Sequence, residues 1–195
     1  MHLTRVCVFC GSSDGARAGY AGAARAMGAA LARRGIGLVY GGGRVGLMGI
    51  LADAVLEGGG NVIGVIPQAM VSKELAHRGL TELRVVASLH ERKAMMAELA
   101  DAFVALPGGY GTFEEFCEIV TWAQLGLHVK PCALLNVEGY YDPLLALFDH
   151  ALEERFVRPA HRDLVMEERQ PERLLDLLES YRPPRLGRWI DRGET

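Results

Sequence analysis

The residues most suggestive of chemistry are those of the segment PGGYGTFEE at residues 107–115. Three glycines between a predicted strand and a predicted helix let backbone N–H groups converge on an anion, and the positive end of the helix dipole adds to the attraction. A capping box formed by Thr112 and Glu115 would explain those two residues without any ligand. It would not explain the three glycines, so we expect this segment to bind a phosphate group.

A second cluster of polar residues, SLHERK at residues 88–93, opens another predicted helix. Ser88 and Glu91 have the spacing of a capping box, which predicts where this helix begins. Arg92 and Lys93 then place two cations in the first turn, where they oppose the helix dipole at a cost of roughly a few tenths of a kcal/mol. An anionic ligand would offset this cost. A pair of solvated charges is the alternative.

Other nucleotide and metal motifs are incomplete. Gly41, Gly43 and Gly46 fit the spacing G-x-G-x-x-G, but they follow the second predicted strand and no acidic residue stands about twenty positions later, so we do not expect NAD. None of the three lysines precedes Ser or Thr, which excludes a P-loop. The six histidines lack paired ligand spacing, and Cys7 and Cys10 would lie on opposite faces of a strand. We expect no metal and no cofactor.

These segments are positioned by short apolar runs that alternate with longer stretches of helical period. Short, continuously apolar strands joined through helices favour a parallel sheet covered on both faces. The predicted fold class is α/β, a Rossmann-like, doubly wound and mostly parallel sheet with ligands at the carboxyl ends of its strands. Strands are expected at residues 5–10, 36–40, 62–66, 83–87, 102–106, 131–136 and 164–166, and helices at 16–34, 47–57, 89–100, 112–125, 141–154 and 171–181.

Length and composition favour one globular domain at residues 1–182, followed by a short basic tail at residues 183–195. The net charge of −3 gives no broad basic surface for nucleic acid, and a solvated tail explains the terminal arginines more simply than nucleic-acid binding does. No apolar run is long enough for a membrane span or a signal peptide. Four scattered cysteines give no disulfide framework, so we expect a cytoplasmic protein.

Four segments, all in order, resemble the LONELY GUY (LOG) family of cytokinin riboside 5′-monophosphate phosphoribohydrolases, which are sometimes labelled lysine decarboxylase-like. They are PGGYGTFEE, HERK at residues 90–93, GGGRVGLMG at 41–49 and TWAQLGLH at 121–128. The resemblance extends from about residue 5 to about residue 180. It implies hydrolysis of the N-glycosidic bond of an adenosine 5′-monophosphate, often with an N6 substituent, to the free base and ribose 5-phosphate.

The resemblance also implies roles for individual residues. Glu115 would be the catalytic carboxylate that stabilises positive charge on the sugar or activates water, and Arg92 would be its partner. The residues that would bind the substrate are Glu74, Lys93, Gly108, Gly109, Tyr110, Gly111, Thr112, Glu114 and Thr121. The family is typically dimeric with substrate sites near the subunit interface, for which the candidates are Trp122, Leu125, Leu127 and His128.

Two alternatives to the hydrolase come from other classes of protein. A non-catalytic nucleotide-binding or sensing module could have the same fold, because fold does not fix function. The complete catalytic set disfavours this alternative. Pyridoxal phosphate chemistry, as in the decarboxylase label, needs a lysine that forms a Schiff base. Lys93 is the candidate near the phosphate segment, and its place beside Arg92 suits anion binding better. Whether the base is adenine or a prenylated adenine stays open.

Overall fold

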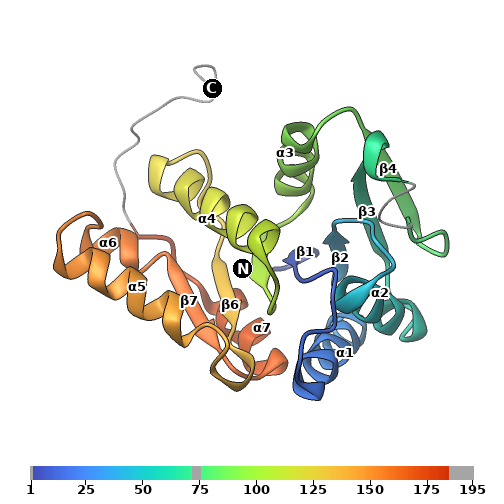
Figure 1. Ribbon diagram of the computed structural model, residues 1–195, viewed down its shortest axis with the longest axis horizontal. Coiled ribbons are helices and arrows are strands. Elements are labelled where there is room, and N and C mark those ends of the chain that lie inside the picture. The colour runs from blue at the N-terminus through green and yellow to red at the C-terminus, as the bar shows by residue number, and fades with distance from the viewer. Residues whose placement is uncertain (1, 72–75, 185–195) are drawn as a thin grey trace.

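The computed structural model describes residues 2–71 and 76–184, and within them a seven-stranded parallel sheet forms the centre of the protein (Figure 1). The order of the strands in the sheet is β4-β3-β2-β1-β5-β6-β7, and every neighbouring pair is parallel. The strands are β1 Arg5–Phe9, β2 Gly37–Tyr40, β3 Val62–Pro67, β4 Glu82–Val86, β5 Ala102–Ala105, β6 Cys132–Leu135 and β7 Val165–Glu168.

Helices connect the strands and cover both faces of the sheet. In Figure 1, α1 and α2 lie together with α7 on one side, whereas α3, α4 and α5 pack against the other face. The helices are α1 Ala18–Arg33, α2 Gly46–Glu57, α3 Leu89–Leu99, α4 Tyr110–Leu125, α5 Asp142–Glu153, the single turn α6 Pro159–Arg162 and α7 Pro171–Ser180, with short 3-10 turns η1 Gln68–Met70 and η2 Val137–Gly139.

The sheet separates two apolar clusters. Val6 and Val8 of β1 pack with residues of α1, α2 and α7, while the alternate residues Cys7 and Phe9 pack with residues of α3, α4 and α5. This alternation follows from the two-residue period of a strand. Cys10 belongs to the first cluster and Cys7 to the second, so the predicted placement of these two thiols on opposite faces is confirmed.

The predicted fold class is confirmed, and every expected strand and helix is present with ends displaced by at most two residues. The capping box at Ser88 is confirmed: Glu91 N–H donates to Ser88 Oγ at 3.1 Å, and Glu91 Oε2 accepts from Ala87 N–H at 2.8 Å. The alternative capping box at residues 112–115 is wrong. α4 begins two residues earlier than expected and its N-cap residue is Gly109, so Thr112 lies inside the first turn.

β1 is the strand at which the chain switches direction across the sheet. β2, β3 and β4 extend the sheet on one side of β1, and β5, β6 and β7 extend it on the other. Backbone hydrogen bonds join the segment after β1 to the segment after β5. Gly11 N–H donates to Pro107 O at 3.0 Å, and Leu106 N–H donates to Phe9 O at 2.9 Å. In doubly wound sheets, ligands bind at the carboxyl ends of the strands at such a switch point.

None of the helices in the described parts of the chain combines the length and hydrophobicity that a transmembrane helix requires. The predicted basic tail lies, from residue 185 onward, outside the described residues.

Candidate active site

A cavity of about 520 Å³ lies at the switch point, where the segment after β1 meets the first turns of α3 and α4. The two polar segments singled out in the sequence therefore face one cavity. Two helix N-termini at one place favour an anionic ligand, because each contributes partial positive charge and N–H donors. The lining residues are Cys10, Gly11, Ser12, Met48, Met70, Leu89, His90, Arg92, Lys93, Gly109, Tyr110, Gly111, Thr112, Glu114 and Glu115.

Arg92 is a buried cation of this cavity, with 8% of its surface exposed. Its Nε donates to Val65 O at 3.1 Å and its Nη2 donates to Gly41 O at 3.3 Å. The same Nη2 lies 3.9 Å from Glu115 Oε1. A buried charge needs hydrogen bonds and a counter-charge, and Arg92 has two carbonyls and a carboxylate. A guanidinium has five N–H donors, so these contacts do not exhaust it.

The glycine run at residues 41–43 makes room for this guanidinium. A Cβ at Gly41 would lie 2.1 Å from Arg92 Nη2. Gly42 has a φ of 79°, a conformation that favours glycine. A Cβ at Gly46 would lie 2.3 Å from the Ser12 backbone, so the start of α2 packs directly on the segment after β1. The run is therefore explained by close packing beside the cavity.

Lys93 joins α3 to α4 through two carboxylates. Its ammonium donates to Glu114 Oε1 and lies 3.0 Å from Glu118 Oε2. Burial acts to lower the pKa of Lys93, but the hydrogen bonds and charges of the two carboxylates outweigh it and raise that pKa above its ordinary value. Lys93 is therefore a firmly protonated cation that already has anionic partners.

Glu115 is the more deeply buried of the two carboxylates that line the cavity: 14% of its side chain is exposed, against 56% for Glu114. The thiol of Cys10 lines the same cavity. Burial raises the pKa of Cys10, and the negative charge of Glu115 raises it further. The thiol is therefore neutral at physiological pH.

The glycines that open α4 fall into two groups. A Cβ at Gly108 would lie 2.1 Å from Thr112 Oγ1, so this glycine is required by packing against the buried Thr112. A Cβ at Gly109 or Gly111 would meet no atom within 4 Å, and neither residue has a positive φ. Nothing in the described chain requires glycine at these two positions. Both line the cavity beside the first N–H groups of α4, which lack intrahelical acceptors.

Of the predicted site residues that the structure describes, Gly108 and Thr121 do not line this cavity. The Thr121 hydroxyl donates to Cys117 O at 2.7 Å. At 1.5 Å per residue, Thr121 lies about 16 Å along α4 from Tyr110. Glu74 lies outside the described residues. Tyr110 does line the cavity, with 92% of its surface exposed.

Sequence reasoning missed several lining residues. Ser12 stands three residues after the end of β1, and its place just beyond an apolar run was the signal that could have found it. Met48, Met70, Leu89 and His90 carry no comparable signal, because their types are common in any core or surface. The three apolar side chains among them give one part of the cavity a hydrophobic wall.

Comparison with known proteins gives relatives over most of the chain. The family model described as "Possible lysine decarboxylase" matches residues 48–178. Cytokinin riboside 5′-monophosphate phosphoribohydrolase LOG3 of Arabidopsis thaliana is 51% identical over 179 residues, which cover 92% of this chain and 83% of the relative. The probable cytokinin riboside 5′-monophosphate phosphoribohydrolase LOGL5 of Oryza sativa subsp. japonica is 55% identical over 180 residues, which cover 92% of this chain and 73% of the relative.

Solved structures share the fold at lower identity. The molybdenum cofactor binding protein of the phototrophic bacterium Rippkaea orientalis has a TM-score of 0.69 at 22% identity, with 92% of this chain and 98% of that chain covered. The molybdenum cofactor carrier protein of Chlamydomonas reinhardtii has a TM-score of 0.69 at 18% identity, with 92% and 100% covered. These likenesses support the α/β architecture alone.

Proposed function

Because this chain belongs to the LONELY GUY family of cytokinin riboside 5′-monophosphate phosphoribohydrolases, we propose that it hydrolyses the N-glycosidic bond of adenosine 5′-monophosphates, with or without an N6 substituent. The products are the free base and ribose 5-phosphate. The observation that carries the proposal is the pair Arg92 and Glu115, buried beside two helix N-termini in one cavity.

The first turn of α4 binds the 5′-phosphate in this proposal. Its N–H groups at Tyr110, Gly111 and Thr112 lack intrahelical acceptors, and the positive end of the helix dipole attracts a dianion. The space left by Gly109 and Gly111 lets a phosphate approach the backbone closely. Anchoring the phosphate orients the sugar, so part of the binding energy contributes to catalysis.

Glu115 supplies the chemistry at C1′. When the bond between C1′ and the base breaks, its electron pair leaves with the base and positive charge develops on the sugar. A carboxylate next to C1′ stabilises that charge or accepts a proton from the attacking water, whose oxygen forms the new bond to C1′. The departing base takes up one proton from solvent, which balances the proton that the water loses. Arg92 holds Glu115 in place, since its guanidinium is itself fixed by two backbone carbonyls.

The decarboxylase description of the matching family model receives no support from Lys93. A Schiff base forms from a neutral amine, and lysines used in this way have a lowered pKa. The pKa of Lys93 is raised, and its ammonium is paired with Glu114 and Glu118. We therefore assign Lys93 to the substrate-binding side of the site, where it fixes Glu114.

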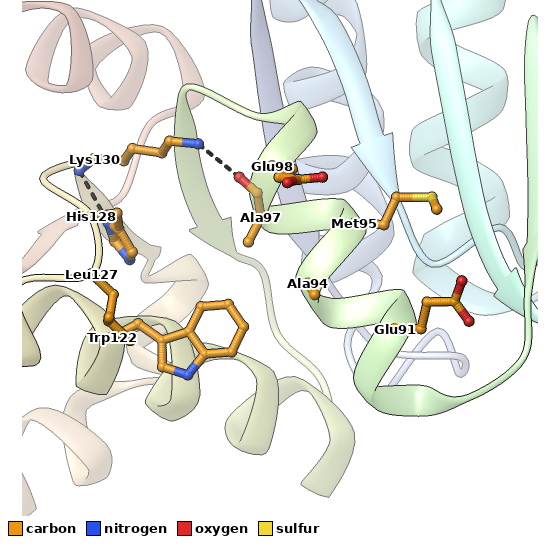
Figure 2. Close-up of a pocket in the computed structure, with 9 residues that line it drawn as sticks. All are labelled: Glu91, Ala94, Met95, Ala97, Glu98, Trp122, Leu127, His128 and Lys130. Atoms are coloured by element: carbon orange, nitrogen blue, oxygen red, sulfur yellow. Dashed lines mark hydrogen bonds between the residues drawn. The ribbon is translucent and has the colours of Figure 1, made fainter. Parts of the chain in front are cut away.

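We also propose that two copies of the chain form a dimer. A second cavity, of about 540 Å³, lies between α3 and the last turn of α4 with the segment that follows it. Figure 2 shows Trp122 and His128 on one side of it and the α3 residues Ala94 and Met95 on the other. Of the four residues predicted for the interface, Trp122, Leu127 and His128 line this cavity and Leu125 does not.

Exposed apolar side chains beside both cavities support the same proposal. Val129 lies between two residues that line the second cavity, whereas Leu89 and Tyr110 line the substrate cavity, and all three side chains are large and exposed. A second copy of the chain that packed along α3 and α4 would cover them. Trp122→Glu should then give a monomer in light-scattering measurements, and a wild-type monomer would contradict the dimer.

The assay for the proposed function is release of free base from AMP and from N6-prenylated AMP, followed by chromatography. Glu115→Gln should lower kcat at least a hundredfold, because it removes the carboxylate charge but keeps the shape. Glu153→Gln, on the exposed side of α5 and away from the cavity, is the matched control and should keep wild-type activity. Absence of base release by the wild-type protein, or full activity of Glu115→Gln, would refute the proposal.

The same assay with unphosphorylated ribosides separates an enzyme from a non-catalytic nucleotide-binding module. The enzyme should release base from the monophosphate far faster than from the riboside. A sensing module would bind AMP without releasing adenine. The ratio of kcat/KM for prenylated AMP to kcat/KM for AMP tests whether the apolar side chains of Met48, Met70 and Leu89 contact an N6 substituent.

A further inference from the structure

The turn that precedes α5 supports the phosphate segment from outside the cavity. Tyr140 Oη donates to Gly108 O at 2.5 Å, and Tyr141 Oη donates to Leu106 O at 2.6 Å. Neither tyrosine lines the cavity. Two consecutive side chains thus hold two carbonyls of the segment that links β5 to α4.

The bond from Tyr140 fixes the direction of a backbone N–H. A peptide unit is planar, and in a trans peptide the N–H points opposite to the C=O of the same unit. The peptide between Gly108 and Gly109 is trans. With its carbonyl held by Tyr140, its N–H must point to the other side, and Gly109 lines the cavity. Gly109 N–H has no acceptor among the described residues.

Aromatic packing holds the Tyr140 ring in one place. The Tyr140 ring meets the Tyr20 ring edge-on at 5.6 Å between centroids and the Tyr141 ring edge-on at 5.0 Å. It stacks on Phe113 of α4 at 6.4 Å. Edge-to-face and offset contacts at these separations are favourable. The hydroxyl therefore reaches Gly108 from a fixed position.

A buried amide anchors the turn itself. Asn136 is fully buried, and its Oδ1 accepts from Tyr141 N–H at 2.8 Å. Its Nδ2 donates to Asp142 Oδ1 at 2.7 Å and to Glu167 Oε2 at 2.9 Å. Both side-chain ends of Asn136 are thus satisfied within the fold. A chain of fixed contacts runs from β6 through this turn to the glycines at the cavity.

We propose that Tyr140 is a positioning residue for phosphate binding: by holding the Gly108 carbonyl, it directs Gly109 N–H at the 5′-phosphate of the substrate. A peptide between two glycines can adopt more orientations than other peptides, because neither residue has a side chain to restrict it. Tyr140 touches no substrate and acts through the backbone. This inference rests on the proposed function, since it presumes a phosphate in the cavity.

The test compares Tyr140→Phe with Tyr20→Phe. Each change removes one hydroxyl from the same aromatic cluster and keeps its ring, but only Tyr140 donates to the phosphate segment. We measure kcat and KM for AMP, and the dissociation constant of ribose 5-phosphate by calorimetry. Tyr140→Phe should raise KM and that dissociation constant about tenfold with kcat changed less than about threefold, as expected for one weakened hydrogen bond to a charged group. Tyr20→Phe should change neither.

The outcomes separate this inference from the proposed function. An unchanged KM and unchanged ribose 5-phosphate affinity in Tyr140→Phe refute the positioning role, while wild-type hydrolysis still supports the enzyme. A lower kcat with unchanged KM and unchanged affinity for ribose 5-phosphate means loss of folded protein, and this outcome also refutes the positioning role. Circular dichroism is used to choose a temperature at which all variants are folded. If the wild type binds ribose 5-phosphate without hydrolysing AMP, the proposed function fails and the affinity ratio still decides the role of Tyr140. A wild type that neither binds ribose 5-phosphate nor hydrolyses AMP overturns both.

Discussion

Replacing Gly111 by alanine should separate substrate binding from folding. Gly111 is the second residue of α4, it has no positive φ, and a Cβ there would meet no atom within 4 Å. Alanine loses less conformational entropy than glycine when a helix forms. The substitution should therefore leave the free energy of unfolding unchanged or raise it by up to about 1 kcal/mol.

The same methyl group should weaken binding of the monophosphate. It would occupy space beside the first N–H groups of α4, which a phosphate must approach to within about 3 Å to accept a hydrogen bond. Loss of one hydrogen bond to a charged group costs about 1.5–3 kcal/mol. This corresponds to a rise in KM of roughly 10- to 150-fold.

Gly22→Ala is the matched control. Gly22 lies inside α1 on an exposed position, and a Cβ there would also meet no atom within 4 Å. Urea unfolding should report equal or higher stability for both variants, and release of adenine from AMP should be impaired only in Gly111→Ala. A wild-type KM in a stable Gly111→Ala variant would refute the argument that bare backbone at this position serves a ligand.

Three further predictions concern other parts of the molecule. Gly108→Ala should lower the free energy of unfolding by about 1–3 kcal/mol, in contrast to Gly111, because the new Cβ would lie 2.1 Å from a side-chain oxygen and 2.8 Å from a backbone nitrogen. Burial acts to raise the pKa of Asp101, but hydrogen bonds from Thr4 and Arg5 outweigh it and lower that pKa. A carboxyl with a lowered pKa stabilises the fold above its ordinary pKa and loses this effect as pH falls. Asp101→Ala should therefore cost about 1–3 kcal/mol at pH 7, and the difference in unfolding free energy between variant and wild type should shrink as pH falls below the ordinary pKa of an aspartate. A thiol reagent at neutral pH should label Cys117 slowly and spare the three buried cysteines, whose pKa values are raised by burial; mass spectrometry of Cys117→Ser should find no label.

The sequence predicted the elements well because their limits are set by local chemistry. Glycine ends α1 at Gly35, whose φ is 66°, and Ser88 begins α3 with a side-chain hydrogen bond. The meeting of the two polar segments also followed from the sequence, since parallel strands bring their carboxyl ends to one edge. The order of the strands, and with it the neighbours of each segment, had no local signal.

Contacts between distant side chains were beyond sequence reasoning for the same reason. The need for glycine at Gly41 depends on Arg92, which stands 51 positions later and reaches it across the sheet. Tyr140 contacts Gly108 from a turn 32 positions away. Neither partner can be recognised by periodicity or by a cap. Such pairs become visible only when the topology places their elements side by side.

The charges around the cavity favour the backbone as the group that binds the phosphate in the proposed function. The helix dipole argument predicted that an anionic ligand offsets the position of Arg92 and Lys93 in the first turn of α3, with a pair of solvated charges as the alternative. The fold already supplies anions, since Arg92 faces Glu115 and Lys93 is held by two carboxylates of α4. A phosphate that approached these cations would also meet their carboxylates. The helix N-terminus at Gly109 and Gly111 offers donors without a nearby negative charge in the first turn of α4. Affinity for the monophosphate should therefore depend more on the direction of these N–H groups than on the number of basic side chains. Gly109 and Gly111 leave the N–H groups accessible, and Tyr140 sets the direction of one of them.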